Sequence, residues 1–103
     1  MVKLTVLYGP PTDPAAFDKH YMETHVPLGE ALPGLRRFEV SKVSGTPDGT
    51  PAPYHLQADL YFDDAAAVKA AFDSPEGHAA GADVANFATG GATMLVSDVV
   101  KES

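Results

Sequence analysis

The order in which strand-like and helix-like segments follow one another constrains this chain most. Four segments have the alternation or the β-branched content of strands, and apolar residues at helical spacing separate them in two places. The predicted order is strand, helix, strand, strand, helix, strand. This order predicts an α+β, ferredoxin-like βαββαβ fold, with a four-stranded antiparallel sheet and both helices on one face. We expect the 103 residues (1–103) to form a single domain.

Turn residues and helix caps set the limits of these segments. The Asp-Pro pair at residues 13–14 and the Ser-Pro pair at residues 74–75 are typical of helix starts. Pro27 predicts a kink or a stop near residues 24–26, followed by a short further helical turn. The predicted strands span residues 2–8, 35–43, 54–62 and 92–100, the predicted helical segments span 14–30, 64–72 and 75–87, and residues 44–53 form a mobile loop rich in Gly and Pro.

Charge and composition exclude several classes of function. The net charge of −7 repels phosphate backbones and anionic membranes, so we expect no nucleic acid and no membrane as partner. The chain has no cysteine, which excludes disulfides, thiolate nucleophiles and cysteine metal sites. The N-terminal residues lack the pattern of a signal peptide, and no stretch reaches the ~18 apolar residues of a membrane span. We therefore expect a soluble, cytoplasmic protein.

The face of the sheet that the helices leave bare is expected to be partly apolar. A face that meets water alternates more strictly, and an apolar face on so small a domain predicts burial against a partner. We therefore expect a homodimer that packs sheet against sheet. The residues predicted on or near this bare face are Thr5, Leu7, Glu39, Val43, Tyr61, Leu95 and Val99.

Acid–base chemistry is the catalytic class that the residue types favour. The sequence has no Gly-x-Ser-x-Gly elbow and no phosphate-binding loop, so we expect no nucleotide cofactor. His20 and His25 are five residues apart, which separates them by about 140° around an α-helix. This spacing is a weak metal signal, and we expect no metal site. A His, Tyr or Asp in an apolar pocket remains.

His25 is the strongest candidate. It shares a helical stripe with Phe17, Tyr21 and Leu28, so its ring is expected to point toward the core. An imidazole with a pKa near ~6.5 suits proton transfer. Backbone carbonyls freed by Pro27 could orient one ring nitrogen for catalysis, or they could hold a purely structural histidine.

Two tyrosines and one aspartate complete the candidates from residue chemistry. Tyr8 and Tyr21 can each present a phenol to the space between sheet and helices, although core packing is the plainer interpretation. Asp59 lies in the middle of a strand, where a carboxylate must be paired or functional. It could orient a histidine, or it could pair with Arg36 or Arg37.

Five motifs follow one another along nearly the whole chain: FDKHYMETHVPL (17–28), LPGLRRFEV (32–40), YHLQADLYFDD (54–64), SPEG (74–77) and DVANF (83–87). Their ordered combination is more specific than any one of them, and it resembles the EthD family, which is named for ethyl tert-butyl ether degradation. The resemblance implies a dimeric α+β barrel related to muconolactone isomerases, cofactor-free monooxygenases and haem-binding proteins.

The resemblance also implies a ligand cavity between sheet and helices, beneath the first helix, with His25 as its polar group. It places His20, Tyr21, His25 and Pro27 on matching motif positions. Together with the residues argued above, the candidate catalytic residues are His25, Tyr21 and Asp59, and the candidate ligand-binding residues are Tyr8, His20, Phe62 and Phe87.

Two classes of function fit these residues. The first is a catabolic enzyme that carries out cofactor-free acid–base chemistry, of the isomerase, dehydratase or oxidoreductase type, on a small apolar or aromatic molecule. Members of the family are often described as oxidoreductases, but nothing in this sequence supports a redox mechanism. The second is a non-catalytic accessory or ligand-binding protein of a degradation pathway. Haem binding through an axial histidine is a third and more remote alternative.

Overall fold

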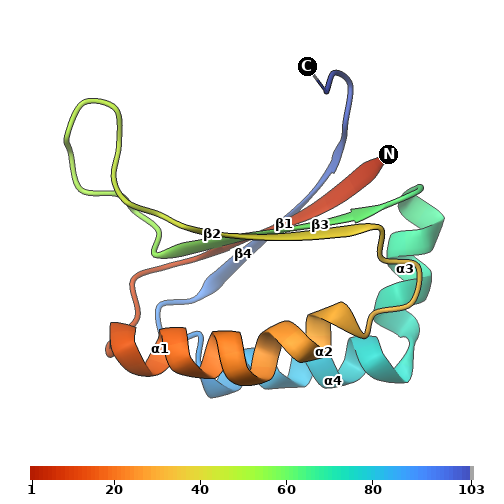
Figure 1. Ribbon diagram of the computed structural model, residues 1–103, viewed down its shortest axis with the longest axis horizontal. Helices are drawn as coiled ribbons and strands as arrows, with labels where there is room; N and C mark the ends of the chain where they lie inside the picture. The colour runs from red at the N-terminus through yellow and green to blue at the C-terminus, as the bar shows by residue number, and fades with distance from the viewer. Residues whose placement is uncertain (103) are drawn as a thin grey trace.

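The computed structural model describes residues 1–102, which form a sheet layer above a helix layer (Figure 1). Both termini lie at the same end of the sheet, and the loop between the second and third strands projects from the opposite end. In chain order the elements are β1 (Val2–Tyr8), α1 (Pro14–His20), the π-helical turn η1 (Tyr21–His25), α2 (Val26–Glu30), β2 (Arg37–Lys42), β3 (Leu56–Phe62), α3 (Ala65–Asp73), α4 (Pro75–Asp83), the 3₁₀ turn η2 (Val84–Asn86) and β4 (Ala92–Asp98).

The strand order β2-β3-β1-β4, with every pair antiparallel, is that of the predicted α+β, ferredoxin-like fold. Three strands are shorter than the sequence predicted. Ladder-like hydrogen bonds nevertheless continue past their ends, because the Arg36 N–H donates to the Tyr61 carbonyl and the Val99 N–H to the Met1 carbonyl. The residues predicted at the ends of these three strands therefore run alongside the sheet but lie outside its strands.

The register places one set of side chains under the helices and the other set on the bare face. Leu4, Val6 and Tyr8 of β1 face the helices and are buried. The bare face carries Thr5, Leu7, Glu39, Tyr61 and Leu95 as predicted, whereas Val43 and Val99 lie outside the strands. The remaining residues of this face are polar: Lys3, Arg37, Ser41, Gln57, Asp59, Thr93 and Ser97.

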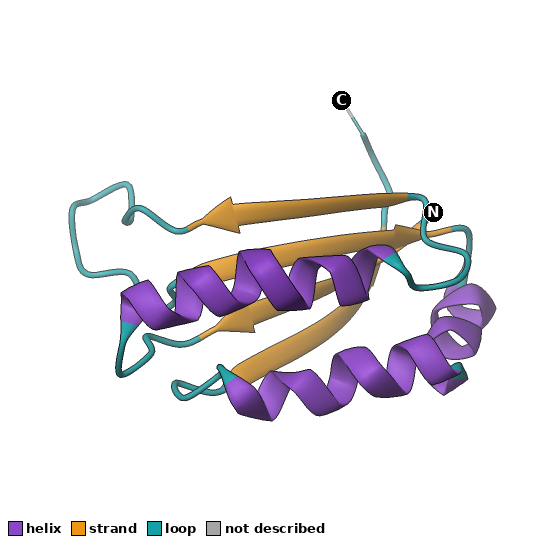
Figure 2. Cartoon of the chain, turned by 60° about the horizontal axis from the view of Figure 1, so that its bottom comes forward, coloured by secondary structure: helices purple, strands orange, loops and turns teal. Residues whose placement is uncertain are grey.

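The first helical segment continues through Pro27 instead of ending before it. Figure 2 shows α1, η1 and α2 as one helix that runs beneath the sheet. Pro27 lies at the start of α2 and therefore inside the continuous helix, where its missing N–H removes one backbone hydrogen bond. The widened turn of η1, in which the Val26 N–H donates to the Tyr21 carbonyl, precedes it. The sequence predicted a kink or a stop at residues 24–26; the helix does not stop there, and a π-helical turn occurs instead.

Helix α4 lies beside α2 under the same sheet face, and glycine sets how closely it follows α3. A Cβ at Gly77 would lie 2.2 Å from the Ala71 carbonyl oxygen, so only glycine fits. The Ser74 side chain caps α4 by accepting a hydrogen bond from the Gly77 N–H. No helix within residues 1–102 has both the length and the apolar character that crossing a membrane requires.

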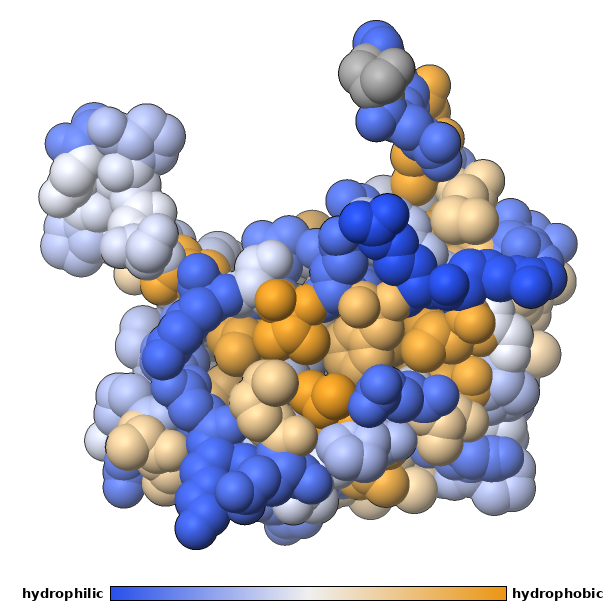
Figure 3. Space-filling model, viewed as in Figure 1, coloured by the Kyte–Doolittle hydropathy of each residue, from blue (hydrophilic) through white to orange (hydrophobic). Residues whose placement is uncertain are grey.

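Hydrophobic side chains gather between the two layers on the face shown in Figure 3, and hydrophilic side chains surround them. The centre of the fold is aromatic: Tyr8, Phe17, Tyr21 and Phe87 are buried and lie within 5.8 Å of one another by ring centroids. This cluster supports the side of the helix layer on which the histidines lie.

Candidate functional site

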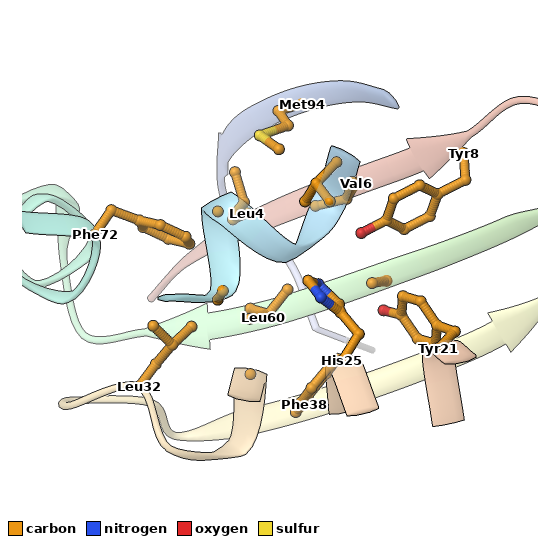
Figure 4. A pocket seen from close by; sticks show the side chains of 15 residues that line it. Leu4, Val6, Tyr8, Tyr21, His25, Leu32, Phe38, Leu60, Phe72 and Met94 are labelled. Carbon is orange, nitrogen blue, oxygen red and sulfur yellow. The ribbon is translucent and has the colours of Figure 1, made fainter. Parts of the chain in front are cut away.

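A pocket lies between the sheet and the helices, and the His25 ring projects into its middle (Figure 4). We call it the His25 pocket. Its cavity volume is about 40 Å³, and its walls are apolar side chains from β1, β2, β3, β4 and the helices. Tyr8 and Tyr21 lie on one side of the ring, and Leu32 and Phe72 lie on the other. The polar side chains of the pocket therefore occupy its middle and the side on which the two tyrosines lie.

The two ring nitrogens of His25 have different surroundings. Nδ1 lies 2.9 Å from Oδ2 of Asp83. Because an ionised carboxylate only accepts, the Nδ1–H donates and the ring is the Nδ1-protonated tautomer. The other nitrogen, Nε2, forms no hydrogen bond with a residue in 1–102, and its unprotonated lone pair is left for the pocket. The sequence had favoured backbone carbonyls as the partner of this ring, and that was wrong because the Nδ1–H donates to the Asp83 carboxylate.

Asp83 ends α4 and is buried, with 7% of its surface exposed. Oδ1 accepts hydrogen bonds from His20 Nε2 at 2.9 Å and from Asn86 Nδ2 at 3.0 Å. Burial works to raise the pKa of the Asp83 carboxyl, but hydrogen bonds from Asn86, His20 and His25 outweigh it and hold that pKa below its usual value. Asp83 is therefore a buried anion that holds two imidazoles.

Burial lowers the pKa of His25 below its ordinary value of 6.5, although the hydrogen bond from Nδ1–H to Asp83 opposes the shift. The ring is consequently neutral at neutral pH. A neutral imidazole with a free Nε2 and an oriented Nδ1–H is the form that accepts a proton from a substrate.

The π-helical turn explains why both histidines reach one carboxylate. In a regular α-helix His20 and His25 would diverge, as the sequence predicted. One extra residue in the turn Tyr21–His25 reduces the angle between them, so both rings point toward Asp83. The prediction that they lie on different faces was wrong for this reason. His20 is half-buried and does not border the His25 pocket.

Tyr8 and Tyr21 both border the pocket beside His25. Burial raises the pKa of Tyr8 to about 12, and it raises the pKa of Tyr21 further still. Both phenols therefore stay protonated at neutral pH. The two hydroxyls also hydrogen-bond to each other, with Tyr21 as the donor, so the Tyr8 hydroxyl keeps its proton for an oxygen atom in the pocket.

Asp59 lies on the opposite side of the sheet from His25. It pairs with Thr5 in the register, and the Thr5 hydroxyl donates to its carboxylate at 2.6 Å. Gln57 donates at 3.0 Å, and Lys3 lies 3.8 Å away. The predicted role of Asp59 beside His25 was wrong because side chains alternate along β3. Its predicted pairing with Arg36 or Arg37 was wrong too, since these bind Asp63 and Glu39.

The other predicted wall residues support the pocket without lining it. Phe62 is completely buried and packs against Phe72. Phe87 lies behind the histidines, with its ring centroid 4.7 Å from that of His25 and 5.4 Å from that of His20. Neither phenylalanine borders the pocket, because other core side chains lie between them and the cavity.

Sequence reasoning missed Asp83 as a functional candidate. A signal was present, because Asp83 is three residues after Ala80 and four before Phe87, both of which are buried. This spacing puts the carboxylate on the buried side of the helix, where it needs a partner.

A metal ion or a haem group at this site would need suitable ligands and enough space. Within residues 1–102, no group of three or more His, Cys, Asp and Glu side chains has an arrangement that could hold a metal ion. A cavity of about 40 Å³ is smaller than the ~150 Å³ that holds benzene, so a porphyrin does not fit it.

Comparisons with known proteins agree with this fold. Residues 9–91 match the family model described as the EthD domain. An uncharacterized 11.0 kDa protein from the thcB-thcC intergenic region of Rhodococcus erythropolis is 49% identical over 98 residues, which are 95% of this chain and 94% of that protein. The crystal structure of an EthD family protein from Bacillus halodurans C-125 is 38% identical, with a TM-score of 0.92, and the match covers 97% of this chain and 99% of that one.

A more distant likeness concerns the fold alone. SnoaB from Streptomyces nogalater, described as a cofactor-independent oxygenase, is 14% identical with a TM-score of 0.70. The match covers 98% of this chain and 94% of that one.

Proposed function

The chain belongs to the EthD family, and from this premise we propose that it catalyses cofactor-free proton transfer on a small, neutral, apolar or aromatic molecule in the His25 pocket. One observation carries the proposal. The His25 ring projects into a largely apolar pocket and its Nε2 has no hydrogen-bond partner within residues 1–102, while its Nδ1–H donates to the buried Asp83. The same pairing of a carboxylate and a histidine orients the general base of hydrolytic triads.

In the proposed reaction His25 Nε2 removes a proton from a carbon next to a carbonyl group. The electron pair of the C–H bond moves into the carbonyl and forms an enolate. The imidazolium that results is stabilised by Asp83 at 2.9 Å. When the enolate is conjugated with a C=C bond, return of the proton to the far carbon completes an isomerisation. When a hydroxyl group is on the β carbon, the enolate expels it and the proton leaves with it as water, which completes a dehydration.

The hydrogen-bonded pair of Tyr8 and Tyr21 supplies the hydrogen-bond donor that such an enolate needs. Both tyrosines border the pocket beside His25, and both phenols are protonated because burial raises their pKa values. A protonated phenol stabilises the negative charge on the oxygen without taking part in the proton transfer. This division of roles makes His25 the base and the tyrosine pair the oxyanion donor.

The lining supports a neutral substrate. No lysine or arginine in residues 1–102 borders the His25 pocket, and Asp83 adds a negative charge behind it. A carboxylate or phosphate group in this pocket would lose its hydration without gaining a cation. The substrate class is therefore a small ketone, lactone or phenol-like enol. SnoaB, which shares the fold, is described as working without a cofactor, and this is compatible with the proposal.

Hydrogen–deuterium exchange tests the proton transfer without knowledge of the natural substrate. We would incubate the protein in D₂O with cyclohexanone or but-2-en-4-olide and follow the protons next to the carbonyl by NMR. The proposal predicts that the wild type accelerates exchange by about 10²-fold or more over buffer and that His25→Gln removes this acceleration.

His78→Gln is the matched control, because His78 is exposed on α4. This variant should accelerate exchange of the substrate protons as much as the wild type does. Compounds that bind in the pocket without any accelerated exchange would contradict the enzymatic proposal and support a ligand-binding protein instead.

We also propose that two copies pack through their bare sheet faces, as the family resemblance implies. Leu95 is 50% exposed on this face, and the buried Asp59 with its Thr5 and Gln57 partners lies at its centre. A second copy would cover these groups.

A further inference from the structure

We propose that Gly81 and Met94 form the mouth of the His25 pocket and that the absence of a side chain at Gly81 sets the size of the molecule admitted. This inference rests on the proposed function, because it takes the His25 pocket as the ligand site. It adds the route of entry and a specificity-determining residue, and neither follows from the chemistry of His25.

On the helix-facing side of the sheet, large apolar side chains are exposed on β4. Met94 pairs with Val6 and Val96 pairs with Leu4, so all four side chains point toward the helix layer. Val6 and Leu4 are buried, whereas Met94 is 53% exposed and Val96 is 59% exposed. The helices therefore cover β1 and leave the neighbouring β4 bare. Met94 both borders the pocket and meets solvent.

The opposite side of the opening is α4. Ala80 is buried and Gly81 is exposed, although both border the pocket. The boundary between pocket and solvent therefore passes between these two neighbouring residues. Val84, one turn further along, also borders the pocket and is half-buried. The mouth thus lies between α4 and β4.

Gly81 has no packing reason to be glycine. A Cβ at Gly77 would lie 2.2 Å from a backbone oxygen, so that position requires glycine, and a Cβ at Gly29 would lie 2.6 Å from the Phe38 ring, which would have to move. A Cβ at Gly81 would meet nothing within 4 Å, and its φ is not positive. Glycine inside a helix is unfavourable compared with alanine. A glycine at position 81 destabilises the helix and is not needed for packing. Its presence beside the pocket is explained if a ligand passes through the space that a side chain would occupy.

The small cavity makes the mouth important. At about 40 Å³ the pocket must widen to hold a ring, since a benzene-sized cavity is ~150 Å³. Met94 is the lining residue best able to move, because methionine has three rotatable side-chain bonds and here one side faces water. Movement of Met94 toward the solvent would open and enlarge the pocket together.

Methionine methyl groups give a direct readout of the mouth. The chain has three methionines, and Met1 and Met22 do not border the pocket. We would label the methionine methyl groups with ¹³C, add p-cresol as the probe, and record the methyl and histidine ring signals by NMR. In the wild type we expect the Met94 methyl and the His25 ring to shift, with Met1 and Met22 unchanged.

Substitutions at the mouth then separate entry from binding. Gly81→Leu should weaken p-cresol binding by about tenfold or more while the fold is retained, because the space for its side chain is open. Gly81→Ala should bind within about threefold of the wild type and melt at a higher temperature. Ala82→Leu is the matched control, since Ala82 is exposed on the same helix and does not border the pocket.

The two proposals fail in different ways. If p-cresol shifts the His25 ring equally in the wild type and in Gly81→Leu, the ligand site stands and the mouth is elsewhere, which overturns this inference. If p-cresol shifts neither Met94 nor His25 in the wild type, the His25 pocket is not a ligand site and both proposals are wrong.

Discussion

At the scale of single residues, Asp83 organises the chemistry. One carboxylate accepts hydrogen bonds from His20, His25 and Asn86, so it fixes the tautomer of His25 as well as its position. Burial lowers the pKa of His25, so its ring is neutral before a reaction. When the ring takes up a proton, the Asp83 carboxylate stabilises the imidazolium that forms.

The depressed pKa of His25 predicts loss of stability in mild acid. Its pKa is lower in the folded than in the unfolded chain, so the folded state binds fewer protons and the stabilisation, present above about pH 6.5, is lost as pH falls. The urea midpoint of the wild type should therefore fall between about pH 7 and pH 5. Urea titrations followed by circular dichroism measure it.

Two variants identify the group responsible. His25→Gln should flatten this pH dependence, and His78→Gln, at an exposed position on α4, should leave it unchanged. A wild-type midpoint that is constant over the same range would contradict the burial of a neutral His25. In stronger acid the Asp83 carboxyl, whose pKa is also lowered, adds a further loss.

At the scale of elements, the π-helical turn Tyr21–His25 lets two histidines that are five residues apart bind the same carboxylate. The periodicity of a regular helix could not predict it, because that reasoning assumes 3.6 residues per turn throughout. Pro27 was a usable signal that hydrogen bonding changes there, but it did not reveal that the helix widens rather than ends. The position of Asp59, in contrast, could have been predicted. Side chains alternate along a strand, so Asp59 and its neighbour Leu60 must lie on opposite faces of the sheet, and Leu60 faces the helices.

Deletion of Glu23 tests the role of this turn. The turn holds one residue more than a regular helix needs, and without exposed Glu23 the two histidines are four apart, which brings them to one face of an α-helix. We expect a folded protein that keeps both histidines near Asp83, as measured by thermal melting and by ¹⁵N NMR of the rings.

Deletion of Lys69 is the matched control. Lys69 is exposed in α3, which has no extra residue, so its loss rotates the buried face by about 100° and should lower the melting temperature far more. An equal fall in melting temperature for the two deletions would mean that η1 does not accommodate an extra residue.

At the scale of the whole molecule, sequence alone could predict the fold better than the site. The strand and helix order depends on local patterns, and the structure has the same order and the same sheet faces. The site depends on which helix faces meet across the fold. Asp83 and His25 are 58 residues apart in sequence, and their contact arises from the packing of α2 against α4. No local pattern encodes that pairing.

The bare sheet face predicts an assembly of two chains. Leu95→Glu puts a charge on this face, and we expect it to convert a dimer of twice 10.8 kDa into a monomer, as measured by light scattering after gel filtration. Val96→Glu is the control, because Val96 is exposed on the same strand but points to the other side of the sheet. A dimer that tolerates Leu95→Glu would mean that the bare face is not the interface.

The protonation state of the His25 ring decides the proposed chemistry, because Asp83 must hold the proton on Nδ1 for Nε2 to be free. Long-range ¹H–¹⁵N NMR of the histidine rings at neutral pH measures this directly. We predict a neutral His25 protonated on Nδ1, whose Nε2 signal shifts when p-cresol is added. An Nε2-protonated or positively charged His25, unaffected by p-cresol, would contradict the account.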